Sequence, residues 1–165
     1  MQNLVSHVSR YASRWWYEPL MALLSAVDAF IPFVPNEPLL AAGVIAKRGR
    51  WLRLGLMMAS GSALGALALA AVVSHWSGWI LGHLLSAKLL RSKGWRESVR
   101  TINRHGWWGL ALISLGPFPQ HAAVIFVGLL GMPLTHVFGA VFAGRAAKYV
   151  ILAWLVARVK NPSRR

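Results

Sequence analysis

Apolar residues run along most of this chain in long stretches that charged residues interrupt at only a few places. Residues 54–87 and residues 105–144 contain no Asp, Glu, Lys or Arg. Each stretch is longer than the roughly 20 apolar residues that cross the hydrocarbon core of a bilayer as a helix. The clearest spanning helices are expected over residues 54–75 and about 133–158. The pattern therefore predicts an all-α integral membrane protein.

Prolines interrupt two further apolar segments, residues 19–46 and residues 107–131. The helical portion at residues 19–30 would be about 18 Å long, too short to cross alone. Proline removes a backbone donor and disfavours helix in the residue before it, so each helix is expected to break there. Non-helical backbone at membrane depth is tolerated where it is buried in protein or lines a wet cavity. We therefore expect two re-entrant helical hairpins. The residues expected at their tips, as a gate, are Pro32, Pro35, Pro38, Pro117, Pro119, Gln120 and His121.

The second half of the chain repeats the outline of the first. Pro32 lies 11 residues before Gly43, and Pro117 lies 11 residues before Gly128. Each broken segment is followed by a spanning helix, and paired Gly/Pro-interrupted segments are typical of transporters with an inverted repeat. The spacing favours such a repeat, with chance as the alternative.

The charged residues indicate which parts of the chain lie outside the hydrocarbon core of the membrane. Of 165 residues, 18 are Lys or Arg and 4 are Asp or Glu, and the cations form clusters between the apolar stretches. Such clusters are typical of membrane flanks that face anionic headgroups, which excludes a nucleic-acid partner because no single basic face forms. Glu18 and Glu97 lie in basic surroundings and are expected at the surface. The chain contains no cysteine, which excludes disulfides.

One membrane domain, residues 19–158, is expected between an interfacial segment, residues 1–18, and a basic tail, residues 159–165. Asp28 and the prolines interrupt its first apolar segment, so a cleaved signal peptide is not expected. Within the domain, residues 77–105 are expected to form an amphipathic connector.

Three arginines of this connector, at 96, 100 and 104, recur every four residues and share one helical stripe. A basic helix on the membrane surface and a solvated connector both fit this pattern. In the first spanning helix, Gly61 and Gly65 form a G-x-x-x-G spacing that lets another helix approach closely. Packing within the protomer is favoured, and a homo-oligomer is the alternative.

Four charged residues inside the apolar segments are the candidates for function. Asp28 and Glu37 lie in the first broken segment, where burial raises the pKa of a carboxyl group and suits it to carry a proton. A helix cap or a pairing with a cation is the structural alternative. Arg145 and Lys148 lie three residues apart on one face of the last helix. They could neutralise the acids, hold an anionic headgroup, or extend towards the interface.

Motifs of covalent or metal chemistry are absent from the sequence. The six histidines form no H-E-x-x-H pair, and the chain contains no G-x-S-x-G, Walker or dinucleotide motif. We therefore expect no metal, no cofactor and no enzymatic activity. His121 is the one histidine that we expect to line a pore or handle protons.

The order and spacing of these motifs resemble the DedA family, also called SNARE-associated or VTT-domain membrane proteins, and most nearly its YqaA-like branch. The resemblance covers about residues 18–157. The matching residues are Asp28, the run Ile31-Pro32-Phe33-Val34-Pro35-Asn36-Glu37-Pro38, Gly43, Gly61-Ser62-Ala63-Leu64-Gly65, Arg104-His105-Gly106, Pro117-Phe118-Pro119, Gly128, Met132-Pro133, Phe138 and Gly144-Arg145.

This resemblance implies two hairpins that meet from opposite sides, and transport or scrambling of lipids. In bacteria it implies recycling of undecaprenyl phosphate at the inner membrane, with proton coupling in some members. The two functional acids of the family correspond to Asp28 and Glu37. Its second hairpin typically carries arginines where this chain has Ser114 and Gln120, and Ala66 replaces an acid.

The leading hypothesis is a multi-pass protein of the bacterial inner membrane that moves an undecaprenyl-phosphate-type lipid or a small anion. Its expected partners are membrane lipids and their anionic headgroups. The alternative is a scaffold that organises lipids or proteins through its basic connector, and a lipid-phosphate enzyme is third. The distribution of Lys and Arg slightly favours four full spans, whereas the resemblance favours hairpins.

Overall fold

Every regular element in the described part of the chain is a helix. The computed structural model describes residues 16–31, 36–79, 91–116 and 120–158. Within these ranges the predicted all-α class is confirmed.

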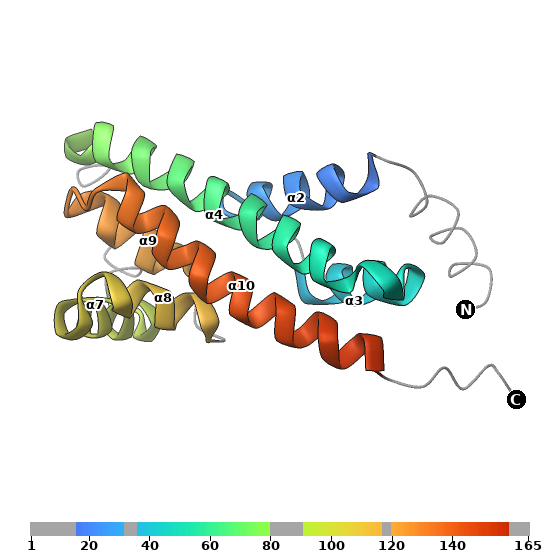
Figure 1. Ribbon diagram of the computed structural model, residues 1–165. Helices are drawn as coiled ribbons and strands as arrows, with labels where there is room; N and C mark the ends of the chain where they lie inside the picture. Colours follow the sequence, from blue (N-terminus) through green and yellow to red (C-terminus); the bar gives the residue numbers. More distant parts are fainter. Residues whose placement is uncertain (1–15, 32–35, 80–90, 117–119, 159–165) are drawn as a thin grey trace, which may run out of the picture.

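Two long helices form the axis of the molecule. α4 (Trp51–His75) and α10 (Leu134–Arg158) have 25 residues each, or about 37 Å. They lie side by side and antiparallel (Figure 1). Gly55 allows this close approach, since a Cβ added there would lie 3.3 Å from the carbonyl oxygen of Tyr149. Both helices are long and apolar enough to cross a membrane, whose hydrocarbon core is about 30 Å thick.

Two short helices, α2 (Tyr17–Val27) and α3 (Asn36–Ala46), form a pair beside the first half of α4. The start of α2 is held to the start of α4 by Glu18, whose carboxylate lies 2.6 Å from Nε of Arg53. The end of α3 leads through one turn, η1 (Arg48–Arg50), directly into α4. The start of α2 and the end of α3, the outer ends of this pair, therefore lie at the same end of the molecule, beside the start of α4.

The glycines of the G-x-x-x-G motif bring α2 against α4. The backbone of Ala22 lies where a side chain on Gly61 would lie, and the backbone of Ala26 does the same at Gly65. Moving four residues along α4, from Gly61 to Gly65, also moves four residues along α2, from Ala22 to Ala26, so the two helices are parallel. The glycines therefore pack helices within the protomer, and α2 ends level with the middle of α4.

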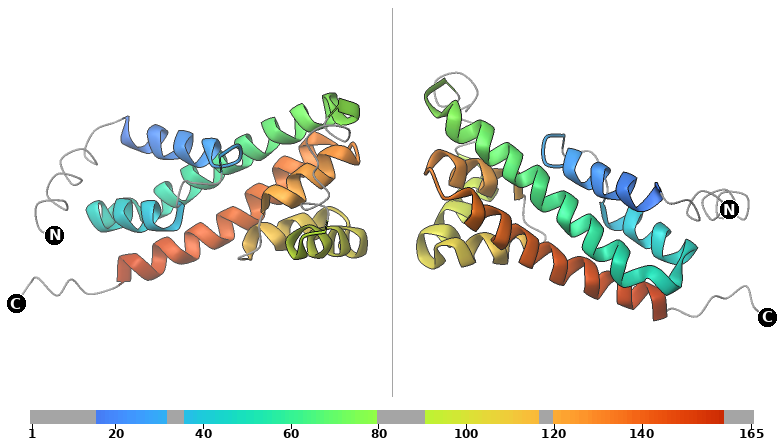
Figure 2. Two further views of the ribbon diagram at one scale, coloured as in Figure 1. Left: turned by 180° about the vertical axis from the view of Figure 1, so that it is seen from behind. Right: turned by 45° about the horizontal axis from the view of Figure 1, so that its top comes forward.

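A second short pair, α8 (Trp107–Leu115) and α9 (Gln120–Leu129), lies at the opposite end (Figure 2). Gly128, near the end of α9, faces Val73, near the end of α4. The outer ends of this pair thus lie where α4 ends and α10 begins.

The two short pairs contact the two long helices in opposite order. α2 packs on α4 and α3 on α10, whereas α8 packs on α10 and α9 on α4. Two apolar clusters result, one where the first pair meets the long helices and one where the second pair meets them.

Helix α7 (Lys93–His105) packs on the second pair through its apolar side. Its N-cap is Ser92, whose hydroxyl accepts a hydrogen bond from the backbone N–H of Trp95 at 3.2 Å. The Trp95 ring meets Phe126 of α9 edge to face at 5.8 Å. Its apolar side is therefore buried in the protein, while the predicted stripe of arginines is exposed. Residues 80–90 of the predicted connector lie outside the described residues.

Several predicted boundaries are wrong. α2 begins at Tyr17 and ends at Val27, so Asp28 lies in a turn. α3 begins at Asn36, which places Pro38 inside its first turn instead of at a tip. Proline is accepted there because the first backbone N–H groups of a helix have no partner within it. Residues 1–15 and the basic tail lie outside the described residues.

The prediction that Glu18 is a surface group is also wrong. Its side chain is 5% exposed and lies 3.0 Å from Arg50 and 2.6 Å from Arg53. Both arginines lie more than 30 residues further along the chain, so the nearest basic residue in sequence, Arg14, did not indicate this pairing.

Replacing Glu18 by glutamine is expected to lower the free energy of unfolding by about 1–2 kcal/mol, because glutamine can accept from only one of the two arginines and loses the charge attraction to both. The measurement is a denaturant titration in detergent micelles. Glu97→Gln is the matched control, since Glu97 lies 3.9 Å from Lys93 on the surface and should change stability little. Equal stability of the two variants would contradict the structural role of Glu18.

Candidate functional site

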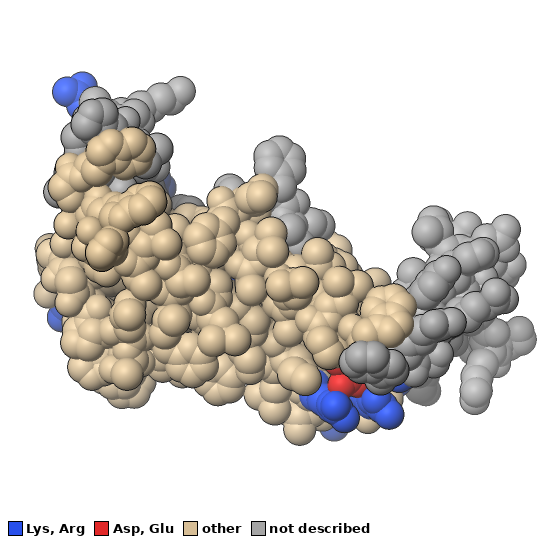
Figure 3. All heavy atoms as spheres, turned by 90° about the horizontal axis from the view of Figure 1, so that it is seen from above, with Lys and Arg blue, Asp and Glu red and all other residues tan. Residues whose placement is uncertain are grey.

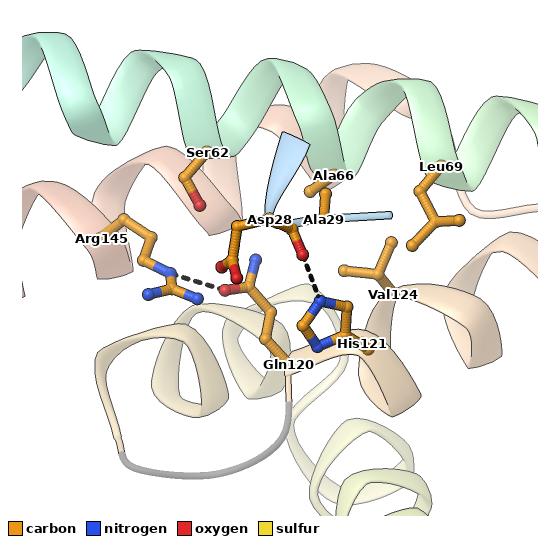
Figure 4. A pocket seen from close by; sticks show the side chains of 9 residues that line it. All are labelled: Asp28, Ala29, Ser62, Ala66, Leu69, Gln120, His121, Val124 and Arg145. Carbon is orange, nitrogen blue, oxygen red and sulfur yellow. Dashed lines mark hydrogen bonds between the residues drawn. The ribbon is translucent and has the colours of Figure 1, made fainter. Parts of the chain in front are cut away.

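A small cavity lies where the two short pairs meet, level with the middle of α4 (Figure 4). It measures about 10 Å³, close to the space that one water molecule needs. Four segments contribute to it: the turn after α2, and helices α4, α9 and α10. The residues that line it are Asp28, Ala29, Ser62, Ala66, Leu69, Gln120, His121, Val124 and Arg145.

Asp28 reaches this cavity from the C-cap position of α2. Its Oδ2 accepts a hydrogen bond of 2.7 Å from Nδ2 of Asn36, the first residue of α3. Asn36 is 3% exposed, and its Oδ1 has no hydrogen-bond partner among the described residues. The contact joins the two helices of the first pair and fixes the carboxylate, which points towards Gln120 (Figure 4).

His121 connects the two pairs. Its Nε2 lies 2.6 Å from the backbone oxygen of Asp28, and a carbonyl oxygen accepts, so this nitrogen donates. His121 is the second residue of α9, whereas Asp28 follows α2. One hydrogen bond therefore closes the contact between pairs that come from opposite ends of the molecule.

Arg145 brings a cation to the cavity from α10. Its Nε donates to Oε1 of Gln120 at 2.6 Å, and a terminal nitrogen donates to the hydroxyl of Tyr149 at 2.8 Å. Gln120 stands where the resemblance leads one to expect an arginine of the second hairpin. In this chain, the last helix supplies a guanidinium group at that place. Ser114, at the other such position, is buried, and no group in the described ranges bonds to its hydroxyl.

Glu37 and Lys148 form an ion pair between α3 and α10, with Nζ 2.7 Å from Oε1. The side chains are 47% and 23% exposed, respectively. Arg145 and Lys148 thus lie near each other but bind different partners. The structure brings all four predicted charged residues to the region where the two pairs contact α10.

Three residues of this region were given no functional role from the sequence. Asn36 directly precedes Glu37, and Tyr149 follows Arg145 by four residues, one helical turn. Ser62 lies beside Gly61 and faces the cavity. The helical spacing of Tyr149 from Arg145 is the one signal that could have identified its role.

Four of the predicted tip residues, Pro32, Pro35, Pro117 and Pro119, lie outside the described residues. Gln120 and His121 begin α9 and line the cavity. Within the described ranges, no group of three His, Asp or Glu side chains could hold a metal ion.

The chemistry available here is ionic. Two cations, two carboxylates, a histidine and several uncharged hydrogen-bonding groups converge between apolar helices. The cations can bind an anion after their present partners move, and the carboxylates can exchange protons. The cavity is too small for a lipid headgroup, so binding one requires the two pairs to separate.

On the face seen in Figure 3, the visible Lys and Arg lie at the two ends of the molecule and the visible acidic atoms at one of them, whereas no charged side chain is seen in the middle. Exposed apolar residues cover the long helices instead, among them Leu64 at 55% and Ile151 at 56%. An apolar surface of this extent fits contact with lipid.

Comparison with known proteins gives one match. The family model described as the VTT domain matches residues 31–158, which include α3, the second short pair and both long helices, whereas α2 and Asp28 lie before the matched range. No curated protein and no solved structure matches the chain.

Proposed function

The chain belongs to the VTT-domain family, also called the DedA or SNARE-associated family, whose members are membrane-associated and thought to be transporter-like; we propose that it moves an anionic lipid of the undecaprenyl-phosphate type, or a small anion, across the bacterial inner membrane. Its assignment to the YqaA-like branch stays a prediction. The observation that carries the proposal is the ionic cluster of Asp28, Glu37, His121, Arg145 and Lys148 near the contact between the two short pairs.

The arrangement of helices supports this function in a definite way. If α4 and α10 span the bilayer, each short pair enters from one face, turns near the midplane and returns as a re-entrant hairpin. The first helix of one pair packs on α4 and the first helix of the other pair packs on α10, and the second helices pack the opposite way. An inverted repeat produces this pattern of contacts. The ionic cluster then lies near the midplane, where transporters with such repeats bind their substrates.

Each charged group has a role in this proposal. Arg145 and Lys148 bind the anionic headgroup, after Gln120 and Glu37 release them. Asp28 and Glu37 take up protons, so that protonation of Glu37 weakens its pairing with Lys148 and frees the cation. The bond from His121 to the Asp28 backbone breaks when the two tips separate. Proton uptake and headgroup binding are thereby linked through the same contacts.

The test is transbilayer movement of headgroup-labelled undecaprenyl phosphate in liposomes that contain the purified protein, with a pH gradient present or absent. Inorganic phosphate in the same liposomes tests the small-anion form of the proposal. Movement that depends on the protein and grows with the gradient is expected. Absence of movement of both substrates, with folding verified by circular dichroism, would contradict transport and favour the scaffold hypothesis.

Arg145→Lys separates geometry from charge at the cluster. Lysine keeps the positive charge but cannot donate to Gln120 and Tyr149 in the forked arrangement of arginine. We expect the substrate concentration for half-maximal transport to rise about tenfold, the effect of one lost charge-assisted hydrogen bond. Arg91→Lys, at an exposed position before α7, is the control and should leave it unchanged. An unchanged value for Arg145→Lys would remove Arg145 from headgroup binding.

A further inference from the structure

A groove separate from the ionic cluster runs between α7 and α8, and none of its lining residues contributes to the cavity. It encloses about 200 Å³, room for several methylene groups but not for a folded domain. The residues that line it are Glu97, Ser98, Arg100, Thr101, Leu112 and Ile113.

The two walls of this groove differ in chemistry. α8 contributes an apolar wall, in which Leu112 is 52% exposed and Ile113 is 3% exposed. α7 contributes a polar wall that carries Arg100. The carboxylate of the groove, Glu97, lies 3.9 Å from Lys93, which offsets its charge. In the described part of the chain, no carboxylate pairs with Arg100, so the polar wall presents an uncompensated cation to the groove.

Aromatic residues indicate the depth of the groove. Trp107 and Trp108, at the start of α8, are 37% and 59% exposed and stack with ring centroids 4.0 Å apart. Exposed tryptophans are typical of the level of the lipid headgroups. Leu112 lies five residues further along α8, about 7.5 Å deeper. With the membrane placement proposed above, the groove extends from the headgroup region into the upper acyl region.

We propose that this groove binds one anionic phospholipid of the surrounding leaflet, with its phosphate on Arg100 and the first part of an acyl chain against Leu112 and Ile113. A headgroup that carries net negative charge fits the uncompensated arginine, and a hydrocarbon chain fits the apolar wall. The lipid acts as a fixed partner that fills the space between α7 and α8. The inference rests on the proposed membrane placement but not on transport.

The experiment uses the full chain in phosphatidylcholine nanodiscs. Trace phosphatidylglycerol with a diazirine near the start of one acyl chain is added, and crosslinked peptides are mapped by mass spectrometry. Phosphatidylcholine with the same diazirine is the comparison lipid. We expect crosslinks on the α8 peptide around Leu112, about fivefold stronger for phosphatidylglycerol, as one cation near an anionic headgroup provides.

Two variants and one control make the test specific. Arg100→Gln should reduce the phosphatidylglycerol crosslink to the level of phosphatidylcholine, and Thr101→Trp should fill the groove and remove both crosslinks. Arg91→Gln loses the same charge outside the groove and should keep the crosslink. Because all three positions lie on the surface or its edge, thermal unfolding midpoints close to wild type are expected for them.

The proposal is overturned if the two lipids crosslink equally, or if Arg91→Gln and Arg100→Gln reduce crosslinking to the same extent, which would indicate diffuse surface attraction. Crosslinks between two copies of the chain at Leu112 would assign the groove to a protein interface instead. None of these outcomes depends on undecaprenyl phosphate moving, so failure of this inference and failure of the transport proposal are distinguishable.

Discussion

Glu37→Gln is expected to reduce transport to the level of protein-free liposomes while the protein stays folded. Glutamine preserves the size of the side chain and can still accept a hydrogen bond from Lys148, which lies 2.7 Å from Oε1 in the wild-type protein. It can neither take up a proton nor alternate between holding and releasing the lysine. The ion pair is partly exposed, so its loss should cost only about 0–1 kcal/mol of stability. Function should therefore fall far more than stability.

The measurement compares flux and the thermal unfolding midpoint in the same preparations. Glu97→Gln, the same chemical change in a surface pair with Lys93, is the control and should retain full transport. Glu37→Asp keeps a titratable carboxyl group on a shorter side chain and should retain part of the flux. If Glu37→Gln transports normally, protonation of Glu37 has no part in the mechanism. If Glu37→Asp is as inactive as Glu37→Gln, side-chain length and not titration is the decisive property.

The sequence predicted the long helices well because a long run of apolar residues can be recognised from the order of residues alone. Each is a long apolar run without proline, and α4 and α10 begin and end within three residues of the predicted bounds. The proline-containing breaks were also predicted, since the missing donor of proline acts locally. Pro38 was expected at a tip because proline was taken as a helix breaker, whereas it lies in the first turn of α3, which tolerates it.

The composition of the cluster was predictable, but its pairing was not. Arg145 and Lys148 are three residues apart, so their side chains diverge by about 60° around the helix axis. That divergence, together with the positions of α3 and α9, directs Lys148 to Glu37 and Arg145 to Gln120. These positions follow from how the helices cross, which residue spacing along the chain does not determine.

Glu18, at one end of the molecule, is a second example of a pairing that residue spacing did not predict. The nearest charged residues in sequence, Arg10 and Arg14, are basic, which suggested a solvated group. In the structure its partners come from the start of α4, because α2 lies parallel to that helix. The parallel packing depends in turn on Gly61 and Gly65, so a feature of the middle of the chain determines the environment of an acid near its beginning.

Gly65→Ala is expected to cause a large loss of stability, together with a loss of transport. The added methyl group would overlap the backbone oxygen of Ala26, and Gly61→Ala would overlap that of Ala22. A backbone atom cannot turn away as a side chain can, so α2 must move from α4. Overpacking of this kind costs about 1–3 kcal/mol at each site. Because Asp28 follows Ala26 by two residues, the same movement displaces the carboxylate and its contact with His121.

Gly139→Ala is the matched control for this variant. Gly139 lies in the interior of α10, and a Cβ added there meets nothing within 4 Å. The control should therefore leave transport unchanged and, since alanine favours helix over glycine by up to about 1 kcal/mol, leave stability equal or slightly higher. Thermal unfolding midpoints and lipid flux of the three alanine variants are the measurements. If Gly65→Ala matches Gly139→Ala in both, close packing of α2 on α4 does not hold Asp28 in place, and the cluster must be positioned by the contacts of α3 and α9 alone.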